Sequence, residues 1–171
     1  MLSRLRLLLA VSTIGVGAPC INGCVRPILT ALFQEERVCE VASIHDGDTM
    51  RLSCDGEQVK VRLYCIDAPE LSQRPWGQES RDRLRAIAPR RVILIRKDMD
   101  SYGRTVGEIL ADDSKRENLN LALVRNGGAA VYSRYCNEGR YFRAEDNARN
   151  LRVGIWRKSG LHQSPERWRH R

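Results

Sequence analysis

The sequence lacks several features that would assign it to a common class of protein. It contains no internal repeat and no low-complexity tract, which argues against a repeat protein or a structureless polar chain. No CxxC pair and no Cys/His spacing suggests a zinc site. No apolar run comfortably reaches the roughly 20 residues of a membrane span. What remains is a 171-residue chain with 42% apolar residues, which suits one folded domain with terminal extensions.

Acidic residues are fewer than basic ones, 21 against 29, so the net charge is +8. This balance favours a polyanionic partner, although a merely soluble basic protein would show it too. The tail from Arg157 to Arg171 holds five Lys or Arg and one acid, which is half of the net charge. Such a tail is usually solvated and disordered, and contact with nucleic acid or anionic lipid is the alternative.

The first 24 residues differ in composition from the rest of the chain. Arg4 and Arg6 open a stretch that contains no acid and is mostly apolar up to Ala18. This order is typical of a secretory signal, so we expect an exported protein, either periplasmic or secreted. An uncleaved anchor and a buried N-terminal helix are the alternatives. The segment Ile21–Cys24 also resembles a bacterial lipoprotein box, which would attach the protein to a membrane.

Four of the six cysteines lie beyond this segment, and an even set in an exported chain favours disulfides. Cys39 and Cys54 flank the turn HDGDT almost symmetrically, so two antiparallel strands would bring them together. A shift of one residue in register would instead separate them. Cys65 and Cys136 would then pair by elimination. Free buried thiols are the alternative.

Hydrophobic periodicity predicts five strands and three helices. The predicted strands are 38–44, 49–54, 58–66, 91–96 and 104–110, and the predicted helices are 76–88, 117–126 and 139–152. Ser114 and Glu117 predict a capping box for the second helix. Five short strands with about three helices predict an α+β fold, a five-stranded β-barrel of the oligonucleotide-binding (OB) type.

Three short motifs carry acids and arginines, and each has an ordinary explanation when taken alone. The acids of Asp46-Gly47-Asp48 are typical turn formers. Asp67 before Ala-Pro commonly ends a strand, because proline removes a hydrogen-bond donor. Tyr102-Gly103-Arg104 fits a hairpin turn with a surface arginine. One feature is less ordinary, since Arg62 interrupts a strand that ends close to the acids Asp67 and Glu70.

Together these motifs resemble the staphylococcal nuclease (thermonuclease) family. Their order is DGDT (46–49), VRLYCIDAPE (61–70), SYGR (101–104) and ENLNLALVRNG (117–127), and the resemblance extends from about Val38 to Trp156. We therefore expect four parts. They are a signal peptide or anchor at 1–24, a linker or short helix at 25–36, a staphylococcal nuclease-like OB-fold domain at 37–157 and a basic tail at 158–171.

The resemblance implies a calcium site. Asp48 and Asp67 match the carboxylates that ligate calcium in the family, and Ala68 matches the residue that supplies a backbone carbonyl, where the family has Thr. Asp46 would stand behind these ligands. Calcium takes oxygen ligands in flexible geometry, so two carboxylates, a carbonyl and waters can hold it and leave a place for a phosphate oxygen.

The resemblance also implies the residues that act on the substrate. Arg62 and Arg104 match the two arginines that hold the phosphate, and Glu70 matches the glutamate near the attacking water. Tyr102 and Tyr135 match tyrosines near the bound nucleotide. Arginine guanidinium groups and a metal ion stabilise the negative charge that develops on a phosphodiester during nucleophilic attack. The family's reaction cleaves the bond to the 5′ oxygen of DNA or RNA and leaves 3′-phosphate products.

The sequence departs from the staphylococcal enzyme in three places. The loop LSQRPW (71–76) is shorter, Ser101 stands where a lysine would contact a terminal phosphate, and that enzyme has no cysteines. The first two changes bear on nucleotide affinity and on preference for strand ends, not on the central chemistry.

The leading hypothesis is an exported, monomeric, Ca²⁺-dependent nuclease of low sequence specificity that acts on DNA, RNA or both. Low specificity follows because the implied groups address phosphate and sugar rather than base edges. Single strands are the favoured substrate, since tyrosines beside a barrel groove can stack bases. A non-catalytic nucleic-acid-binding module of the same fold is the alternative, and a membrane-anchored interaction protein is a third. Neither alternative requires all five of the implied acids and arginines.

Overall fold

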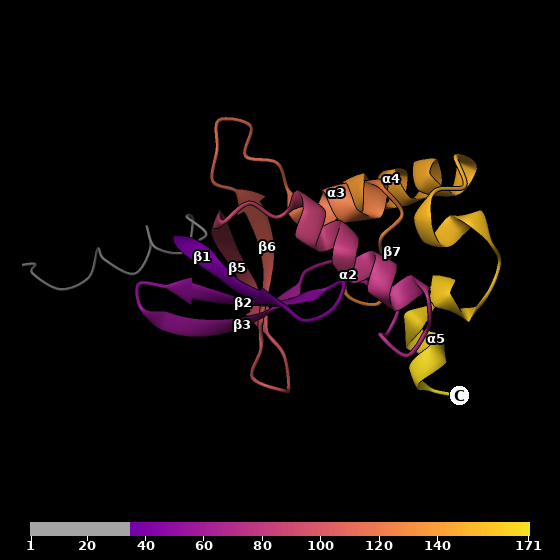
Figure 1. Cartoon of the computed structure of the whole chain (residues 1–171), viewed down its shortest axis with the longest axis horizontal. Coiled ribbons are helices and arrows are strands. Elements are labelled where there is room, and N and C mark those ends of the chain that lie inside the picture. Colours follow the sequence, from indigo (N-terminus) through magenta and orange to yellow (C-terminus); the bar gives the residue numbers. More distant parts are fainter. Residues whose placement is uncertain (1–34) are drawn as a thin grey trace, which may run out of the picture. The chain divides into compact units, whose positions relative to one another are not determined.

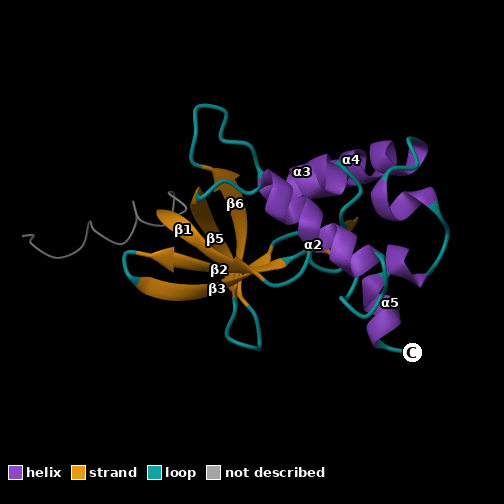
Figure 2. Ribbon diagram, in the orientation of Figure 1, coloured by secondary structure: helices purple, strands orange, loops and turns teal. Residues whose placement is uncertain are grey.

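The computed structural model describes residues 35–171, and the predicted signal, lipoprotein box and most of the linker lie outside them. Five strands close into a barrel in the order β1-β2-β3-β6-β5. Figure 1 is coloured along the sequence, and Figure 2 shows that the helices lie together beside the barrel. The barrel strands are β1 (Glu36–Ile44), β2 (Thr49–Cys54), β3 (Glu57–Leu63), β5 (Arg91–Met99) and β6 (Thr105–Ala111). The predicted α+β barrel of the OB type is therefore confirmed.

The first three strands form an antiparallel meander, whereas β3 and β6 run parallel. The alternation predicted for β3 is present, since Val61 and Leu63 are buried in the core and Lys60 is exposed. The β1–β2 register pairs Glu40 with Ser53, which places Cys39 beside Cys54. These two cysteines form a disulfide with a Cα–Cα distance of 4.3 Å.

The strand predicted to run to Ile66 ends earlier, at Leu63. Cys65 has a φ of 67°, in the left-handed region, so the chain turns there and the alternation stops. Ile66 and Asp67 then form a separate short strand, β4 (Ile66–Asp67), which pairs with β7 (Ala130–Val131). A second disulfide joins Cys65 to Cys136, as elimination predicted. The turn and the disulfide together place Asp67 next to a segment more than 60 residues further along the chain.

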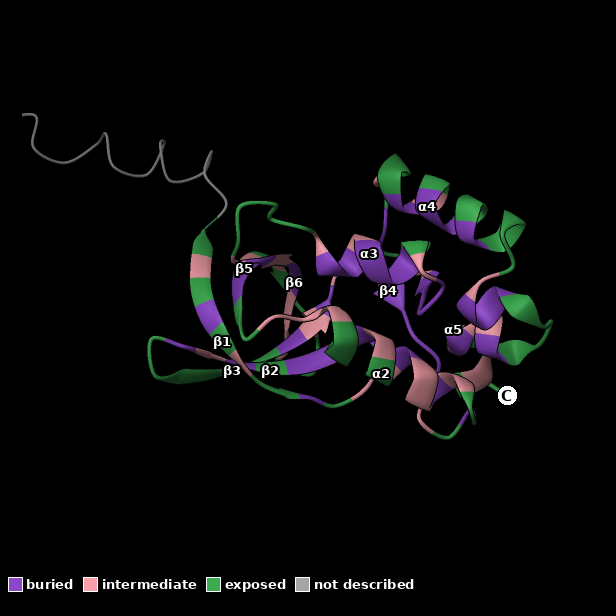
Figure 3. Cartoon of the chain, turned by 45° about the horizontal axis from the view of Figure 1, so that its top comes forward, coloured by how far each residue is buried: buried purple, intermediate pink, exposed green. Residues whose placement is uncertain are grey.

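The three predicted helices are present as α2 (Trp76–Ile87), α3 (Leu119–Arg125) and α4 (Gly139–Asn150). Helix α3 is largely buried, while α4 buries one stripe that includes Tyr141 and Ala148 (Figure 3). The predicted capping box is wrong. Asn118 caps α3 instead, because its side-chain oxygen accepts a hydrogen bond from the Leu121 backbone N–H at 2.9 Å.

The C-terminal tail differs from the disordered tail expected of a basic run. It follows a short 3-10 helix, η1 (Gly154–Arg157), and forms a second one, η2 (Leu161–Gln163), and the helix α5 (Pro165–Arg169). The His162 ring is buried and stacks on Trp76 of α2 with 4.0 Å between ring centroids. Stacking of this kind anchors a charged segment that hydrophobic periodicity does not reveal. No helix between residues 35 and 171 has the length and apolar character of a membrane span.

Candidate active site

Two of the predicted metal ligands lie on either side of one predicted phosphate-binding arginine. Arg62 extends from the end of β3. Its Nη1 lies 2.9 Å from Asp48 Oδ2, and its Nη2 lies 3.2 Å from Asp67 Oδ1. All three side chains are largely buried, with 12%, 10% and 2% of their surface exposed. A guanidinium in this position holds two neighbouring carboxylates that would otherwise repel each other.

The backbone fixes Asp48 in its place before β2. Asp46 Oδ1 accepts the Asp48 backbone N–H at 3.0 Å, so the first Asp of DGDT supports the second. Asp48 Oδ2 accepts the Ala68 backbone N–H at 2.7 Å. Gly47 has a separate role, because a Cβ at this position would lie 1.8 Å from Ser80 Oγ of α2. The glycine therefore lets the helix approach the turn, and these contacts join motifs 20 residues apart.

Electrostatics in this cluster disfavour a second negative charge. Burial and the neighbouring Asp48 raise the pKa of Asp67 to about 6, although Arg62 and Arg169 pull it down. Burial and Asp48 also raise the pKa of Asp46. Further positive charge at Asp67 would therefore be stabilising.

Glu70 lies beyond the Pro69 turn, and a residue that the sequence did not single out connects it to Asp67. Arg169 of α5 donates from Nη1 to Glu70 Oε1 at 2.8 Å. Its Nη2 donates to Asp67 Oδ1 and Oδ2 at 3.0 and 3.2 Å. One side chain therefore reaches both acids, which places them close together. The basic tail was noticed in the sequence, but nothing in it indicated where Arg169 would lie.

A cavity of about 440 Å³ is lined by Arg62, the partner of Asp67, and by the remaining predicted residues. Arg104 lines it, with its Nε 2.6 Å from Asp100 Oδ2, and so does Arg62. The predicted Tyr102 and Tyr135 line it too, and both are exposed. The cavity therefore offers two guanidinium groups and aromatic rings to a ligand.

Two more tyrosines, Tyr64 and Tyr132, line the same cavity, and sequence reasoning did not assign them to the site. The Arg62 guanidinium lies over the Tyr132 ring at 6.0 Å, and the Tyr132 ring packs edge-on against Tyr135 at 4.9 Å. Tyr132 directly follows β7, the strand that pairs with Asp67. Only the β4–β7 pairing would have indicated that Tyr132 lies at the site, and these strands are too short to be recognised by periodicity.

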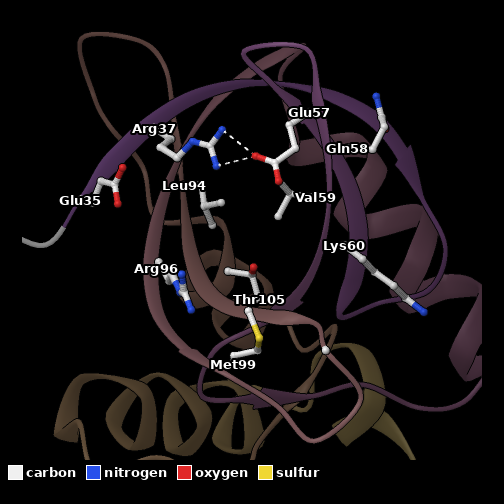
Figure 4. A pocket seen from close by; sticks show the side chains of 11 residues that line it. Glu35, Arg37, Glu57, Gln58, Val59, Lys60, Leu94, Arg96, Met99 and Thr105 are labelled. Atoms are coloured by element: carbon white, nitrogen blue, oxygen red, sulfur yellow. Dashed lines mark hydrogen bonds and ion pairs between the residues drawn. The ribbon is translucent and has the colours of Figure 1, made fainter.

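A second hollow, of about 250 Å³, lies at an end of the barrel and is distinct from this site (Figure 4). Arg37 reaches across its rim to Glu57, with Nη2 3.2 Å from Oε2. Lys60 and Arg96 also line it. It contains none of the residues predicted for catalysis or metal binding, so it does not compete as the candidate active site.

The donors at the site fit a hard cation that is bound by few protein groups. Asp48 and Asp67 supply buried carboxylate oxygens, and calcium prefers oxygen ligands. Between residues 35 and 171 no three Asp, Glu, His or Cys side chains gather as metal ligands. A site in which the Ala68 carbonyl, water and substrate complete the coordination by two carboxylates does not require a third carboxylate.

The comparisons agree with this architecture. Residues 60–158 match the family model described as "Staphylococcal nuclease homologue", and the chain belongs to the staphylococcal nuclease family. An "Uncharacterized endonuclease" of Haemophilus influenzae is 35% identical over 83% of this chain and 78% of its own. "Protein ParB" of Escherichia coli is 38% identical over 76% and 77%. "Micrococcal nuclease" of Shigella flexneri is 33% identical over 76% and 79%.

Proposed function

We propose that this protein is a nuclease that hydrolyses phosphodiester bonds of DNA, RNA or both with calcium as its cofactor. The observation that carries the proposal is the placement of Arg62 between Asp48 and Asp67, beside a cavity lined by Arg104. Family membership and relatives named as nucleases support it. The site residues are Arg62, Glu70 and Arg104 for catalysis, Asp48, Asp67 and the Ala68 carbonyl for the metal, and Tyr102 and Tyr135 for the substrate.

The two arginines bind the scissile phosphate and stabilise the charge that it gains under attack. Arg62 is already oriented by two carboxylates and Arg104 by Asp100, so neither side chain needs to be ordered when substrate binds. A guanidinium stays charged at any physiological pH and presents paired donors to phosphate oxygens. Calcium, when bound, would add positive charge beside the same phosphate.

Glu70 accepts the proton of the attacking water or orients that water. Its side chain is more open than those of the two aspartates, with 39% exposed against 10% and 2%. Water therefore reaches Glu70 more easily than it reaches Asp48 or Asp67. Because Arg169 donates a hydrogen bond to Glu70 Oε1, the carboxylate has to exchange this partner for water before it can act.

The substrate is a single strand read with little sequence specificity. The cavity presents arginines for phosphates and tyrosine rings for base stacking, and neither kind of contact depends on base identity. Export to an oxidising compartment is part of the proposal. The two disulfides support it, because such bonds persist mainly outside the reducing cytosol.

The deciding experiment is hydrolysis of a labelled single-stranded DNA by the full chain, with millimolar CaCl₂ or with a chelator. We expect cleavage only in calcium, and a drop of roughly a hundredfold in kcat for Glu70→Gln. Glu117→Gln is the matched control, because it makes the same change at an exposed acid outside the site, and it should leave the rate unchanged.

The alternative is a non-catalytic module of the same fold that only binds nucleic acid. Binding of the labelled strand without cleavage, in calcium, magnesium and manganese alike, would establish this alternative and refute the nuclease.

A further inference from the structure

The C-terminal helix brings a further guanidinium to two acids of the site, one of which, Asp67, also pairs with Arg62. Arg169 binds Asp67 through Nη2 and Glu70 through Nη1, with distances between 2.8 and 3.2 Å. It lies 102 residues along the chain from Asp67 and 99 from Glu70. The family model ends at residue 158, so Arg169 belongs to a segment outside the matched domain.

The segment that carries Arg169 is held by its own contacts. His162 is buried, and its Nε2 lies 2.9 Å from the Ile155 carbonyl oxygen and 2.8 Å from that of Lys158. Pro165 is buried at the start of α5, and Glu166 pairs with Arg134 at 3.5 Å. These contacts hold the segment against the rest of the domain, and they position Arg169 beside the two acids.

We propose that α5 is an internal cationic plug, in which Arg169 occupies the acids that would otherwise receive the divalent ion and the attacking water. The proposal rests on the metal site of the proposed function. A calcium ion lies about 2.3–2.6 Å from its carboxylate oxygens. Both oxygens of Asp67 already accept a positively charged donor, so calcium and Arg169 compete for them.

The same contact restrains Glu70. Its Oε1 already accepts a hydrogen bond from Arg169 Nη1 at 2.8 Å, so this oxygen cannot contact the attacking water at the same time. With Arg169 in place, both acids have a cationic partner, whereas displacement of α5 removes Arg169 from Glu70 Oε1 and from both oxygens of Asp67. Metal binding therefore opens the site, and the plug makes the calcium affinity of the full chain lower than that of the acids alone.

A different role for Arg169, as a third phosphate ligand, makes the opposite prediction. A phosphate ligand would be needed for cleavage, and its removal would lower the rate. A plug is an obstacle, and its removal tightens metal binding. Arg169→Ala separates the two roles, and Arg169→Lys keeps the charge but loses the fork that reaches two acids at once.

The test is calcium titration by calorimetry of the full chain, with CaCl₂ alone as the probe. We expect Arg169→Ala to bind calcium roughly tenfold more tightly than the unaltered chain, and Arg169→Lys to fall between them. Arg167→Ala is the matched control, because Arg167 is an exposed arginine of the same helix. The calcium affinity of this variant should equal that of the unaltered chain. Circular dichroism verifies that each variant is folded.

Hydrogen exchange gives a second readout on the unaltered chain. If calcium displaces α5, the backbone amides of residues 166–171 should exchange faster at saturating CaCl₂ than without it, while those of the barrel strands should not. Calcium binding that is equally tight with and without Arg169, or weaker without it, overturns the plug and leaves the nuclease intact. Calcium binding by none of the variants refutes the metal site and the plug together. Normal calcium binding with lost cleavage in Arg169→Ala identifies a phosphate ligand instead.

Discussion

Two buried carboxylates of this protein, Glu108 and Asp67, both have cationic partners, yet their pKa values are shifted in opposite directions. Both side chains are almost fully buried, with 5% and 2% exposed. The pKa of Glu108 is lowered, whereas the pKa of Asp67 is raised to about 6. Burial raises both, so the difference lies in what each carboxylate contacts.

Glu108 is surrounded by hydrogen-bond donors. Its Oε1 accepts the Tyr141 hydroxyl at 2.6 Å and the Asn118 amide at 2.8 Å, and its Oε2 lies 3.2 Å from Lys97 Nζ. These donors outweigh the effect of burial on the pKa. The carboxylate is thus stabilised as an anion and joins β6 to α3 and α4.

Asp67 has arginine partners too, but it faces Asp48 across Arg62. The second acid raises its pKa beyond what burial alone does. Glu108 therefore stabilises the fold, whereas Asp67 and Asp48 repel each other, and a bound cation would reduce this repulsion. This pattern is expected where a site is built for a ligand rather than for stability.

The largest effect that this comparison predicts is on stability. Glu108→Gln removes the more buried of the two anions that pair with Lys97 and Arg140, and it should lower the free energy of unfolding by about 3 kcal/mol, measured by urea denaturation. The cleavage rate per folded molecule should not change. Glu138→Gln is the control, because Glu138 lies in the same cluster but is more exposed, at 28%, and its loss should cost under about 1 kcal/mol. Equal losses in the two variants would contradict the structural role of Glu108.

Much of this arrangement was predictable from local sequence, because local rules determine it. Alternation and turn residues determine the barrel strands, and the family motifs indicated Arg62, Asp48 and Asp67 before any geometry was known. Apart from the Cys65–Cys136 disulfide, contacts between distant segments were not predictable. The β4–β7 pair has two residues in each strand, and the contact between Arg169 and Asp67 spans 102 residues. In the sequence such a tail is indistinguishable from a solvated basic run.

An intermediate effect, on catalysis, distinguishes the arginines of the two clusters. Arg62→Lys keeps a charge beside Asp48 and Asp67 but loses the fork that joins them, and kcat on single-stranded DNA in calcium should fall roughly a hundredfold. Arg140→Lys makes the same change beside Glu108 and should leave kcat unchanged. A similar loss of rate in both variants, or in neither, would remove the distinction between a catalytic and a structural cluster.

The smallest effect is a gain in stability at the site itself. Because the pKa of Asp67 is about 6 in the folded protein and 3.8 in the reference state, the folded protein binds more protons between these values. The stability that depends on Asp67 is therefore present below about pH 4 and is lost as the pH rises through about 6. Asp67→Asn, which cannot ionise, should raise the free energy of unfolding by about 1 to 3 kcal/mol at about pH 7 while abolishing cleavage.

The pH dependence makes this gain specific to the buried charge. The advantage of Asp67→Asn should shrink as the pH falls from about 6 and should disappear below about pH 4, where the native aspartate is protonated in both states. Asp82→Asn removes an exposed acid of α2 and should change stability little at either pH. If Asp67→Asn instead destabilised the protein at neutral pH, Asp67 would be held as firmly as Glu108, and the two carboxylates would serve the fold alike.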